Sequence, residues 1–428
     1  MKRLLFFILA AIIAVPAAII GLDYVRDPGS DEPSIPVANR AEQIARGAYL
    51  ARAGDCMACH TARGGEPYAG GRAIPTPFGS IFAPNITPEA TTGIGKWSAD
   101  DLWRALHNGK SKDGQFLYPA FPYPNYTKVT RADSDALHAY LRTLKPVKQP
   151  NKEHELRFPY NQRILLAFWR TLYFKPESFR PDTKQSAEWN RGAYLVQGLG
   201  HCSACHTSRN ALGATDVKAE LSGGMIPMLN WYASPLTSGA EAGLGEWEIQ
   251  HIAALLKTGV SPRGAVFGPM AEVVRESLQH LSDADISAMA VYLKSLPQTE
   301  APATQPSKWV SPQDTEYLLK LGSKVYEKHC VECHQANGEG VPPAYPPLAG
   351  SRSLTAHTAI NPVRIVVNGG YPPSTAGNPR PYGMPPFGPV LSDTEVAAVV
   401  SYLRNAWGNR GELVTPTEVE RYRGVPTE

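Results

Sequence analysis

The chain of 428 residues has almost no excess charge, because 42 lysine and arginine residues stand against 39 aspartate and glutamate residues, a formal net charge of +3. Proteins that bind nucleic acid through its phosphates present a basic face or stripe. The even balance offers no surplus for such a face. The composition therefore argues against a nucleic-acid partner.

Cysteine is scarce, with six residues in the whole chain, and none of the six stands alone. They form three pairs, each followed directly by histidine: Cys56-Met57-Ala58-Cys59-His60, Cys202-Ser203-Ala204-Cys205-His206 and Cys330-Val331-Glu332-Cys333-His334. No cysteine is left over for a disulfide framework. The C-x-x-C-H spacing is the attachment signature of haem c, in which two thiols bond to the porphyrin vinyl groups and the histidine becomes an iron ligand.

Two other kinds of site use paired cysteines. A four-thiolate zinc site consumes pairs two at a time, so three pairs leave one over. A redox-active dithiol of the thioredoxin type is expected once, without a histidine after every pair. With zinc and dithiol sites as the alternatives, the sequence predicts three covalently bound haem c groups, with His60, His206 and His334 as iron ligands.

The three motifs divide the chain into comparable stretches, because their first cysteines are residues 56, 202 and 330. A chain of this length suggests about three domains, so each domain is expected to carry one haem. The stretch Arg46-Gly47-Ala48-Tyr49-Leu50 ahead of the first motif recurs as Arg191-Gly192-Ala193-Tyr194-Leu195 ahead of the second. The equivalent helix before the third motif is expected over 317–329.

Each of these stretches also ends alike. A Ser or Thr followed three residues later by an acid is typical of a helix start, and it predicts closing helices over 130–144, 282–296 and 392–407. A tyrosine recurs at the same place in all three, as Tyr140, Tyr292 and Tyr402.

These patterns predict an all-α, loop-rich fold of three tandem class I cytochrome c-like domains with one covalent haem each. Abundant proline and glycine, 39 and 37 residues, suit loops that wrap a prosthetic group. The expected boundaries are a signal or N-terminal anchor with its tether over 1–34, domain 1 over 35–150, an interdomain helix and linker over 151–185, domain 2 over 186–296, a linker over 297–313, domain 3 over 314–410 and a C-terminal tail over 411–428.

The longest apolar run extends from Leu4 to Leu22, behind Lys2 and Arg3. Basic residues ahead of an apolar run are typical of an export segment. Its nineteen residues are long for the hydrophobic region of a signal peptide and just long enough to span a bilayer. A cleaved signal and an uncleaved anchor remain alternatives, and both predict a location on the periplasmic side of the inner membrane.

A shorter apolar stretch runs from Ile164 to Trp169 and continues after Arg170 as Leu172-Tyr173-Phe174. It is too short to span a bilayer. An interdomain helix is the simplest interpretation. An interfacial or partner-docking helix is the alternative, because aromatic residues favour such edges.

Methionine is also scarce, with seven residues, so the sixth iron ligand has few candidates. A thioether ligand favours ferrous iron and raises the reduction potential. Met270 and Met384 stand among glycine and proline ahead of the closing helices, and we predict that they lie in loops and bind the second and third iron. Met225 and Met228 compete for the second iron, whereas Met289 is expected in the core.

The first domain breaks this pattern. Apart from Met1 and Met57 it has no methionine, and Phe121 stands near the position where the spacing of the other domains expects one. The first haem is therefore five-coordinate or takes another ligand. His107 is the nearest candidate in sequence and His138 a weaker one, although a surface or capping role is commoner for an arbitrary histidine.

With these residues the chain resembles the three-haem cytochrome c subunit of bacterial membrane-bound dehydrogenases. Besides the three motifs, the resemblance is carried by 78–87 (Phe-Gly-Ser-Ile-Phe-Ala-Pro-Asn-Ile-Thr), 93–97 (Gly-Ile-Gly-Lys-Trp) and 117–120 (Leu-Tyr-Pro-Ala). It implies a subunit that takes electrons from a large catalytic subunit (a quinoprotein, flavoprotein or molybdenum enzyme) and passes them to ubiquinone or a terminal oxidase. It also implies His/Met ligation at each haem, from which Phe121 departs.

A self-standing haem enzyme is the competing hypothesis, in which an open first haem binds peroxide or another small ligand. Phe121 favours it, but the sequence places no general acid or base motif above that haem. Trp97 and Trp247, at matching positions before the middle helices, are candidates to donate hydrogen bonds to haem propionates, with buried packing as their other expected role.

Overall fold

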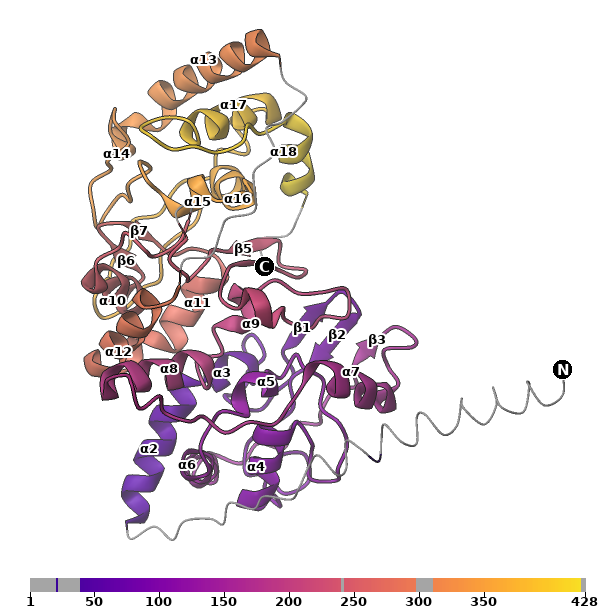
Figure 1. Cartoon of the computed structure of the whole chain (residues 1–428). Helices are drawn as coiled ribbons and strands as arrows, with labels where there is room; N and C mark the ends of the chain where they lie inside the picture. The colour runs from indigo at the N-terminus through magenta and orange to yellow at the C-terminus, as the bar shows by residue number, and fades with distance from the viewer. Residues whose placement is uncertain (1–20, 22–38, 240–241, 298–310, 425–428) are drawn as a thin grey trace, which may run out of the picture. The chain divides into compact units, whose positions relative to one another are not determined.

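The computed structural model describes Gly21 and residues 39–239, 242–297 and 311–424 (Figure 1). The predicted export segment and tether, apart from Gly21, and most of the predicted linker 297–313 lie outside the described residues. Within the described ranges, no helix combines the length and the apolar character needed to cross a membrane.

The chain forms two compact units. Unit 1 contains residues 1–183, 194–201 and 211–214, and unit 2 contains residues 184–193, 202–210 and 215–428. Helix α8 (Ala187–Gln197) contributes its first half to unit 2 and its second half to unit 1.

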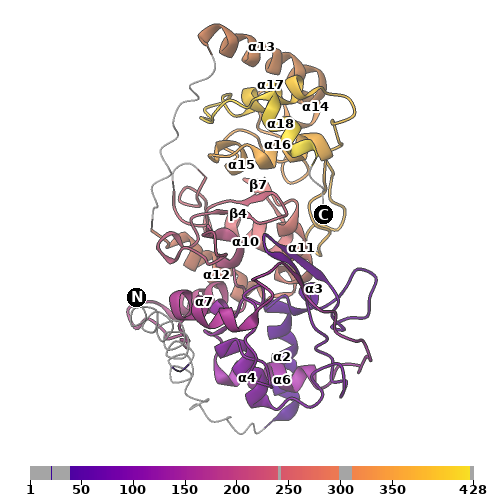
Figure 2. The ribbon, with the colours of Figure 1, turned by 90° about the vertical axis from the view of Figure 1, so that its right-hand side faces the viewer.

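Unit 1 contains two helices that cross at a glycine. Helix α2 (Arg40–Ala53) leads into the short helix α3 (Cys56–Cys59), and α6 (Arg131–Leu141) packs across α2 (Figure 2). A side chain at Gly47 would lie 1.9 Å from the carbonyl oxygen of Ala136, so only glycine permits this approach. Helix α4 (Ala99–Asn108) packs on α6, and the short helix α5 (Tyr123–Tyr126) packs on α4.

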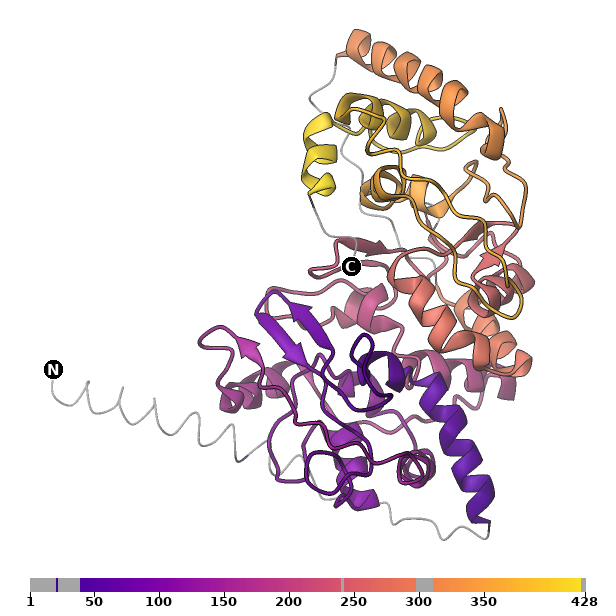
Figure 3. The same ribbon diagram turned by 180° about the vertical axis from the view of Figure 1, so that it is seen from behind.

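A small sheet and a further helix complete unit 1. Strands β1 (Ala73–Thr76), β2 (Gly79–Phe82) and β3 (Glu155–Leu156) are antiparallel in that order, and β1 and β2 form the purple hairpin of Figure 3. The predicted helix between the first two motifs is confirmed as η1 (Arg163–Leu165) followed by α7 (Leu166–Tyr173).

Unit 2 holds the second and third motifs. The elements around the second motif are α9 (Ser203–His206), η2 (Val217–Ala219), β4 (Gly224–Ile226), β5 (Trp231–Ala233), α10 (Ile249–Thr258), β6 (Val260–Ser261), β7 (Gly264–Ala265), α11 (Pro269–Glu276), η3 (Leu278–His280) and α12 (Asp283–Lys294). Strands β4 and β5 form one antiparallel hairpin, and β6 and β7 form another.

The elements around the third motif form a helical cluster with its own apolar core. They are α13 (Pro312–His329), α14 (Val331–His334), α15 (Arg352–Thr355), α16 (Ile360–Asn368), α17 (Asp393–Leu403) and α18 (Pro416–Arg423). Helix α13 lies across α17, at the top of Figure 1. Val363, Val396 and Val400 are fully buried beneath this crossing.

The helix crossing seen in unit 1 recurs in unit 2. A side chain at Gly192 would lie 1.9 Å from the carbonyl oxygen of Ala288, and one at Gly322 would lie 2.1 Å from that of Ala398. The recurring tyrosines of the closing helices pack at the same places, with the Cβ atoms of Tyr140, Tyr292 and Tyr402 among the nearest atoms. The opening helix thus packs closely on the closing helix at all three positions.

The closing helices begin where their capping residues predict. Thr130, Ser282 and Ser392 each accept a hydrogen bond from the backbone N–H three residues later. The helices end at Leu141, Lys294 and Leu403, two to four residues before the predicted ends.

Two predictions at the C-terminal side are wrong. The helix before the third motif begins at Pro312, inside the predicted linker, because Ser311 caps it by accepting from the N–H of Asp314. The tail predicted over 411–428 contains α18, which Thr415 caps and which packs on α16 and α17. Val419 of α18 is fully buried, so this part of the fold extends beyond residue 410.

Candidate haem attachment sites

The first motif starts at a sharp turn of the backbone. Asp55 takes a left-handed conformation, with φ 50°, between the end of α2 and the start of α3. Cys56 and Cys59 therefore fall on one short helical turn. His60 ends this turn, where its backbone N–H donates to the carbonyl oxygen of Cys56. The local fold holds two thiols and one imidazole together.

Each motif histidine is oriented by a backbone carbonyl. A carbonyl oxygen can only accept, so the ring proton sits on Nδ1 and the lone pair on Nε2. This is the tautomer of a histidine that binds a metal through Nε2. The distances from Nδ1 to the carbonyl oxygen are 2.8 Å for His60 and Pro84, 2.7 Å for His206 and Ser234, and 3.1 Å for His334 and Pro346.

The three rings are also electrostatically suited to bind iron. Burial lowers the pKa of His60 and of His334. For His206 the pKa falls to about 4, because the ring is buried and because the guanidinium of Arg352 lies near it. A metal ligand has to be neutral imidazole, and burial favours that form in all three motifs.

None of the six cysteines forms a disulfide. Burial raises the pKa of Cys56 and of Cys202 to about 12, and that of Cys330 to about 11. The described part of the chain holds no group of three or more His, Cys, Asp or Glu that suits a metal ion. A cysteine pair outside any disulfide, next to a neutral imidazole, fits the covalent attachment of haem c.

Two arginines that the sequence analysis missed support the attachment loops. Nη1 of Arg72 donates to the carbonyl oxygen of Ala58 at 2.6 Å, and Nη2 of Arg209 donates to that of Ala204 at 2.7 Å. Ala58 and Ala204 occupy the same position in their motifs, directly before the second cysteine. The two arginines stand at different distances from their motifs in the sequence, so spacing alone gives no signal for the shared role.

Met384 packs against the same apolar core as the third motif. Its backbone pairs with Gly370, with N–H to carbonyl distances of 2.8 and 3.0 Å, outside any helix, as the prediction of a loop requires. The Met384 side chain is half-buried and packs against the core cluster that Cys330 also contacts. Its ligation of iron stays a prediction.

Met270 is not in a loop, and that expectation is wrong. Pro269 occupies the first turn of α11, so Met270 lies at the start of a helix and is half-buried. The backbone ahead of it is tightly packed, because a side chain at Gly268 would lie 2.7 Å from the ring of Trp231. Met289 is buried, as expected, while the competing Met225 and Met228 are 42% and 54% exposed on the β4–β5 hairpin.

The surroundings of Phe121 connect it to the first motif. Its ring lies 5.2 Å from that of Tyr126, measured between centroids. The Tyr126 hydroxyl donates to the carbonyl oxygen of Gly54 at 3.2 Å, two residues before Cys56. Burial raises the pKa of Tyr126 well above its usual value, so its hydroxyl keeps its proton. An aromatic pair, Phe121 and Tyr126, thus occupies the place where the family resemblance implies a methionine.

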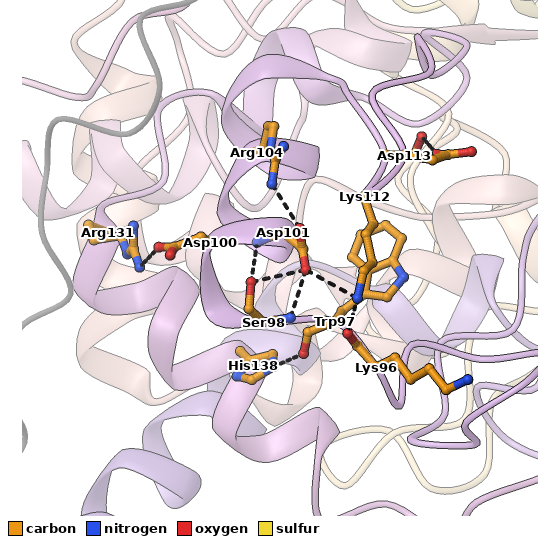
Figure 4. Close-up of polar contacts among 11 residues, drawn as sticks. Lys96, Trp97, Ser98, Asp100, Asp101, Arg104, Lys112, Asp113, Arg131 and His138 are labelled. Atoms are coloured by element: carbon orange, nitrogen blue, oxygen red, sulfur yellow. Dashed lines mark hydrogen bonds and ion pairs between the residues drawn. The ribbon is translucent and has the colours of Figure 1, made fainter.

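The two histidine candidates for the first haem hold backbone groups. Nδ1 of His107 donates to the carbonyl oxygen of Thr127 at 2.8 Å, and its ring stacks on Trp103 at 4.5 Å. Nε2 of His138 bonds to the carbonyl oxygen of Trp97 at 3.0 Å (Figure 4). These contacts give each ring a packing role, and ligation by His107 stays a prediction.

Trp97 is held close to the first motif by the start of α4. Figure 4 shows the capping box in which Ser98 and Asp101 exchange hydrogen bonds, with Asp101 also accepting from Arg104. Trp97 packs in a half-buried cluster that includes Cys56. The matching Trp247 in unit 2 is buried.

The segment after α8 packs against the first motif within unit 1. A side chain at Gly54 would lie 3.2 Å from Cδ2 of Leu199 and 3.4 Å from Sγ of Cys56. The ring of His201 meets that of Tyr126 edge to face at 5.6 Å. The segment that leads directly into Cys202 therefore lies beside the first attachment loop.

Comparisons with known proteins agree with this geometry. A family model described as cytochrome c matches residues 44–145 and 319–407. The gluconate 2-dehydrogenase cytochrome c subunit of Pantoea cypripedii is 41% identical over 401 residues, which cover 89% of each chain. The cytochrome c subunit of alcohol dehydrogenase (quinone) from Gluconobacter oxydans (strain 621H) is 38% identical over 98% of this chain and 88% of its own. The fructose dehydrogenase cytochrome subunit of Gluconobacter japonicus is 38% identical over 92% of this chain and 85% of its own.

Proposed function

Because this chain belongs to the family of cytochrome c subunits of membrane-bound dehydrogenases, we propose that it is an electron-transfer subunit that carries three haem c groups. The electron-transfer role and the covalent haem c follow from the family. The count of three haems goes beyond the match to the cytochrome c family model, because the matched ranges 44–145 and 319–407 contain only the first and third motifs. The observation that carries it is one geometry repeated three times: a C-x-x-C pair that forms no disulfide, followed by a histidine whose Nδ1 is held by a carbonyl.

The residues of each site have distinct tasks in this proposal. One cysteine pair per site would hold the porphyrin through thioether bonds, and the motif histidine would bind iron through Nε2. Met270 and Met384 are the proposed sixth ligands of the second and third iron. Haem c, when bound, supplies the one-electron chemistry; the surrounding burial, hydrogen bonds and charges set its potential.

The partner in this proposal is a catalytic dehydrogenase subunit that transfers substrate electrons to this chain. The named relatives are cytochrome subunits of gluconate, alcohol and fructose dehydrogenases. A quinoprotein, flavoprotein or molybdenum enzyme would serve as the partner, and ubiquinone or a terminal oxidase as the acceptor, on the periplasmic side of the inner membrane.

Purification tests this role. Mild solubilisation of the membranes is expected to yield the chain together with a larger subunit, and one member of a panel of alcohols, aldehydes, aldonic acids and sugars is expected to reduce its haems. Absorbance of the reduced haems measures this directly. A chain that purifies alone and that no substrate reduces would contradict the assignment.

The segment 158–173, which includes η1 and α7, supports contact with the membrane surface, because it exposes apolar side chains while it buries an arginine. Arg170 is buried, donates to the carbonyl oxygen of Asn108 and lies over the rings of Phe116, Tyr123 and Phe174 at 4.8 to 5.6 Å. Leu166 and Ala167 of α7 are buried as well, but six other apolar side chains of the segment are exposed. The exposed fractions are 80% for Phe158, 69% for Leu172, 52% for Ile164, 42% for Leu165, 40% for Tyr160 and 36% for Tyr173. A patch of this kind suits the interface of a lipid bilayer.

We expect vesicles of anionic phospholipid to slow hydrogen–deuterium exchange across residues 158–174 of the full chain. The double variant Ile164→Asp/Leu172→Asp should lose most of this protection. Each introduced aspartate would have to give up its hydration to enter the lipid interface, which costs free energy. Val217→Asp is the matched control, since Val217 is 79% exposed outside the patch. Equal exchange with and without vesicles in the wild-type chain would refute membrane contact at α7.

A self-standing haem enzyme remains the second candidate because of Phe121. The absence of a methionine at this position leaves the first iron without its expected sixth ligand. Carbon monoxide titration separates the two functions: an electron-transfer site closed by another ligand binds none, whereas an open site binds one equivalent per chain.

A further inference from the structure

Arg352 stands at an unexpected place for a residue of the predicted third domain. It begins α15, after the third motif, yet its guanidinium lies within the second site. Its Nε donates to the carbonyl oxygen of Ala242 at 2.5 Å, and its Nη2 donates to that of Pro235. The guanidinium also lies over the ring of Trp247, 5.6 Å from the centroid.

These contacts place the Arg352 guanidinium near His206, the predicted iron ligand. The carbonyl of Ser234 orients His206, and the carbonyl of the next residue, Pro235, accepts from Arg352. The nearby guanidinium lowers the pKa of His206 further than burial alone does. The imidazole and the guanidinium are therefore anchored to consecutive residues of one backbone segment.

The position of Arg352 is fixed by its own neighbourhood. Asn361, at the start of α16, exchanges two hydrogen bonds with the backbone of Tyr232 on β5, at 2.9 and 2.7 Å. Ala356 and Ile360 pack with Tyr232 in a small buried cluster. Helices α15 and α16 are thereby attached to the segment that carries Ser234 and Pro235.

The charge of Arg352 lacks a counter-ion among the described residues. Its side chain donates to two carbonyl oxygens, and no carboxylate of the described part of the chain lies within ion-pairing distance. Burial lowers its pKa to about 10, which reports the cost of keeping the charge there. An enclosed guanidinium is stabilised by a carboxylate that accepts its remaining N–H groups.

We propose that Arg352, together with Trp247, binds a propionate of the haem held by Cys202, Cys205 and His206. The inference rests on the proposed haem at this site. The guanidinium offers N–H groups that its two carbonyl partners do not use, and the indole beneath it supplies a flat support and an N–H donor. Arg352 is a positioning residue here, since it acts on the potential of the iron through the field of its charge and through the propionate.

The proposed contact has a consequence for electron flow. A fixed positive charge beside a haem disfavours the extra positive charge of ferric iron, and thus raises the reduction potential. Because Arg352 lies on α15, after the third motif, the fold around the third motif would set the reduction potential of the second haem. Loss of the charge should therefore lower one midpoint potential in the chain and leave the others unchanged.

The test compares Arg352→Gln with Arg352→Lys in the full-length chain, by spectroelectrochemical titration of every haem. Arg352→Gln is expected to shift the ferric-to-ferrous ratio of one haem about tenfold at a given potential, a downward shift of about 59 mV for one electron. Arg352→Lys keeps the charge and should shift that haem less. Lys218→Gln, which removes an exposed charge from η2 in the same unit, should shift none. The Cys202→Ala/Cys205→Ala chain identifies the affected haem, because the redox transition missing from its titration belongs to the second motif.

Infrared difference spectra, reduced minus oxidised, provide a second readout that does not depend on the Gln variant folding. In a chain with [15N]arginine, a guanidinium band should respond to reduction and should be absent from Arg352→Lys. Glu241, outside the described residues, directly precedes the acceptor Ala242 in the sequence, so Glu241→Gln is the control for a protein counter-ion. The band should persist in Glu241→Gln.

Three outcomes would overturn the inference: unchanged midpoints in a fully haem-loaded Arg352→Gln chain, no arginine band that Arg352→Lys removes, or loss of the band in Glu241→Gln. Failure of the proposed function looks different. It would show as two haems per wild-type chain in the pyridine haemochrome assay, with none attached to the Cys202–His206 peptide.

Discussion

Replacing both cysteines of any one motif with alanine is expected to lower the covalently bound haem from the proposed three to two per chain. Each pair lies on its own helical turn and is followed by its own carbonyl-held histidine, so the sites do not share donors. Cys56→Ala/Cys59→Ala, Cys202→Ala/Cys205→Ala and Cys330→Ala/Cys333→Ala should each remove a third of the pyridine haemochrome absorbance per mole of chain.

Serine substitutions at a position of the motif that carries no ligand control for nonspecific loss. Ala58→Ser and Ala204→Ser alter the residue before the second cysteine without removing a thiol, and they should keep all three haems. The decisive pair is Cys202→Ala/Cys205→Ala, because the cytochrome c family model does not match that region. An unchanged haem content in this variant would contradict a haem at the second motif, and with it the count of three.

The sequence predicts this molecule best where a single stretch of chain decides the structure. The three attachment turns need only the cysteine pair and the next histidine, and the closing helices need only a capping residue and an acid three positions later. The glycine at the first two helix crossings is visible as a repeat, because both Gly47 and Gly192 stand in an Arg-Gly-Ala-Tyr-Leu stretch. Its reason, a carbonyl oxygen 1.9 Å from the place of the missing side chain, is visible only in the fold.

Some errors came from local signals that were present but misinterpreted. Gly268 and Pro269 indicate a loop, but proline is also favoured in the first turn of a helix, and here it begins α11. Thr415 and Glu418 form a capping box, which marks α18 inside a stretch interpreted as a tail. Both helices are eight residues long, so their apolar periodicity is too brief to outweigh the neighbouring proline and polar residues.

Other features depend on contacts between distant parts of the chain. Arg352 reaches Pro235 and Ala242 across more than a hundred residues, and Arg72 reaches back to Ala58 across a loop. Spacing rules carry no information about such pairs, because the side chain that meets a given carbonyl is chosen by tertiary packing. The residues that tune a haem are therefore harder to predict than the residues that attach it.

The residue at position 121 can be tested as a determinant of ligand binding at the first haem. Phe121 pairs with Tyr126, whose hydroxyl bonds to Gly54 just ahead of Cys56, so the side chain of residue 121 lies in the neighbourhood of the first attachment turn. We expect Phe121→Met to place a thioether there. Because methionine ligation stabilises ferrous iron, the variant should gain low-spin ferric iron, a sulfur-to-iron charge-transfer band and a higher midpoint potential at one haem.

Carbon monoxide binding measures whether the first iron has an open coordination position. In the wild-type chain a five-coordinate first haem would bind one equivalent, and Phe121→Met should abolish that binding. Phe82→Met, on β2 of the same unit, makes the same chemical change elsewhere and should leave the stoichiometry unaltered. If the wild-type chain binds no carbon monoxide and His107→Gln creates a binding site, His107 is the sixth ligand and the first haem is closed. If Phe121→Met changes neither spectrum nor binding, residue 121 does not reach the iron. The self-standing enzyme then loses the observation that favours it, because an aromatic residue at this position would no longer account for an open iron.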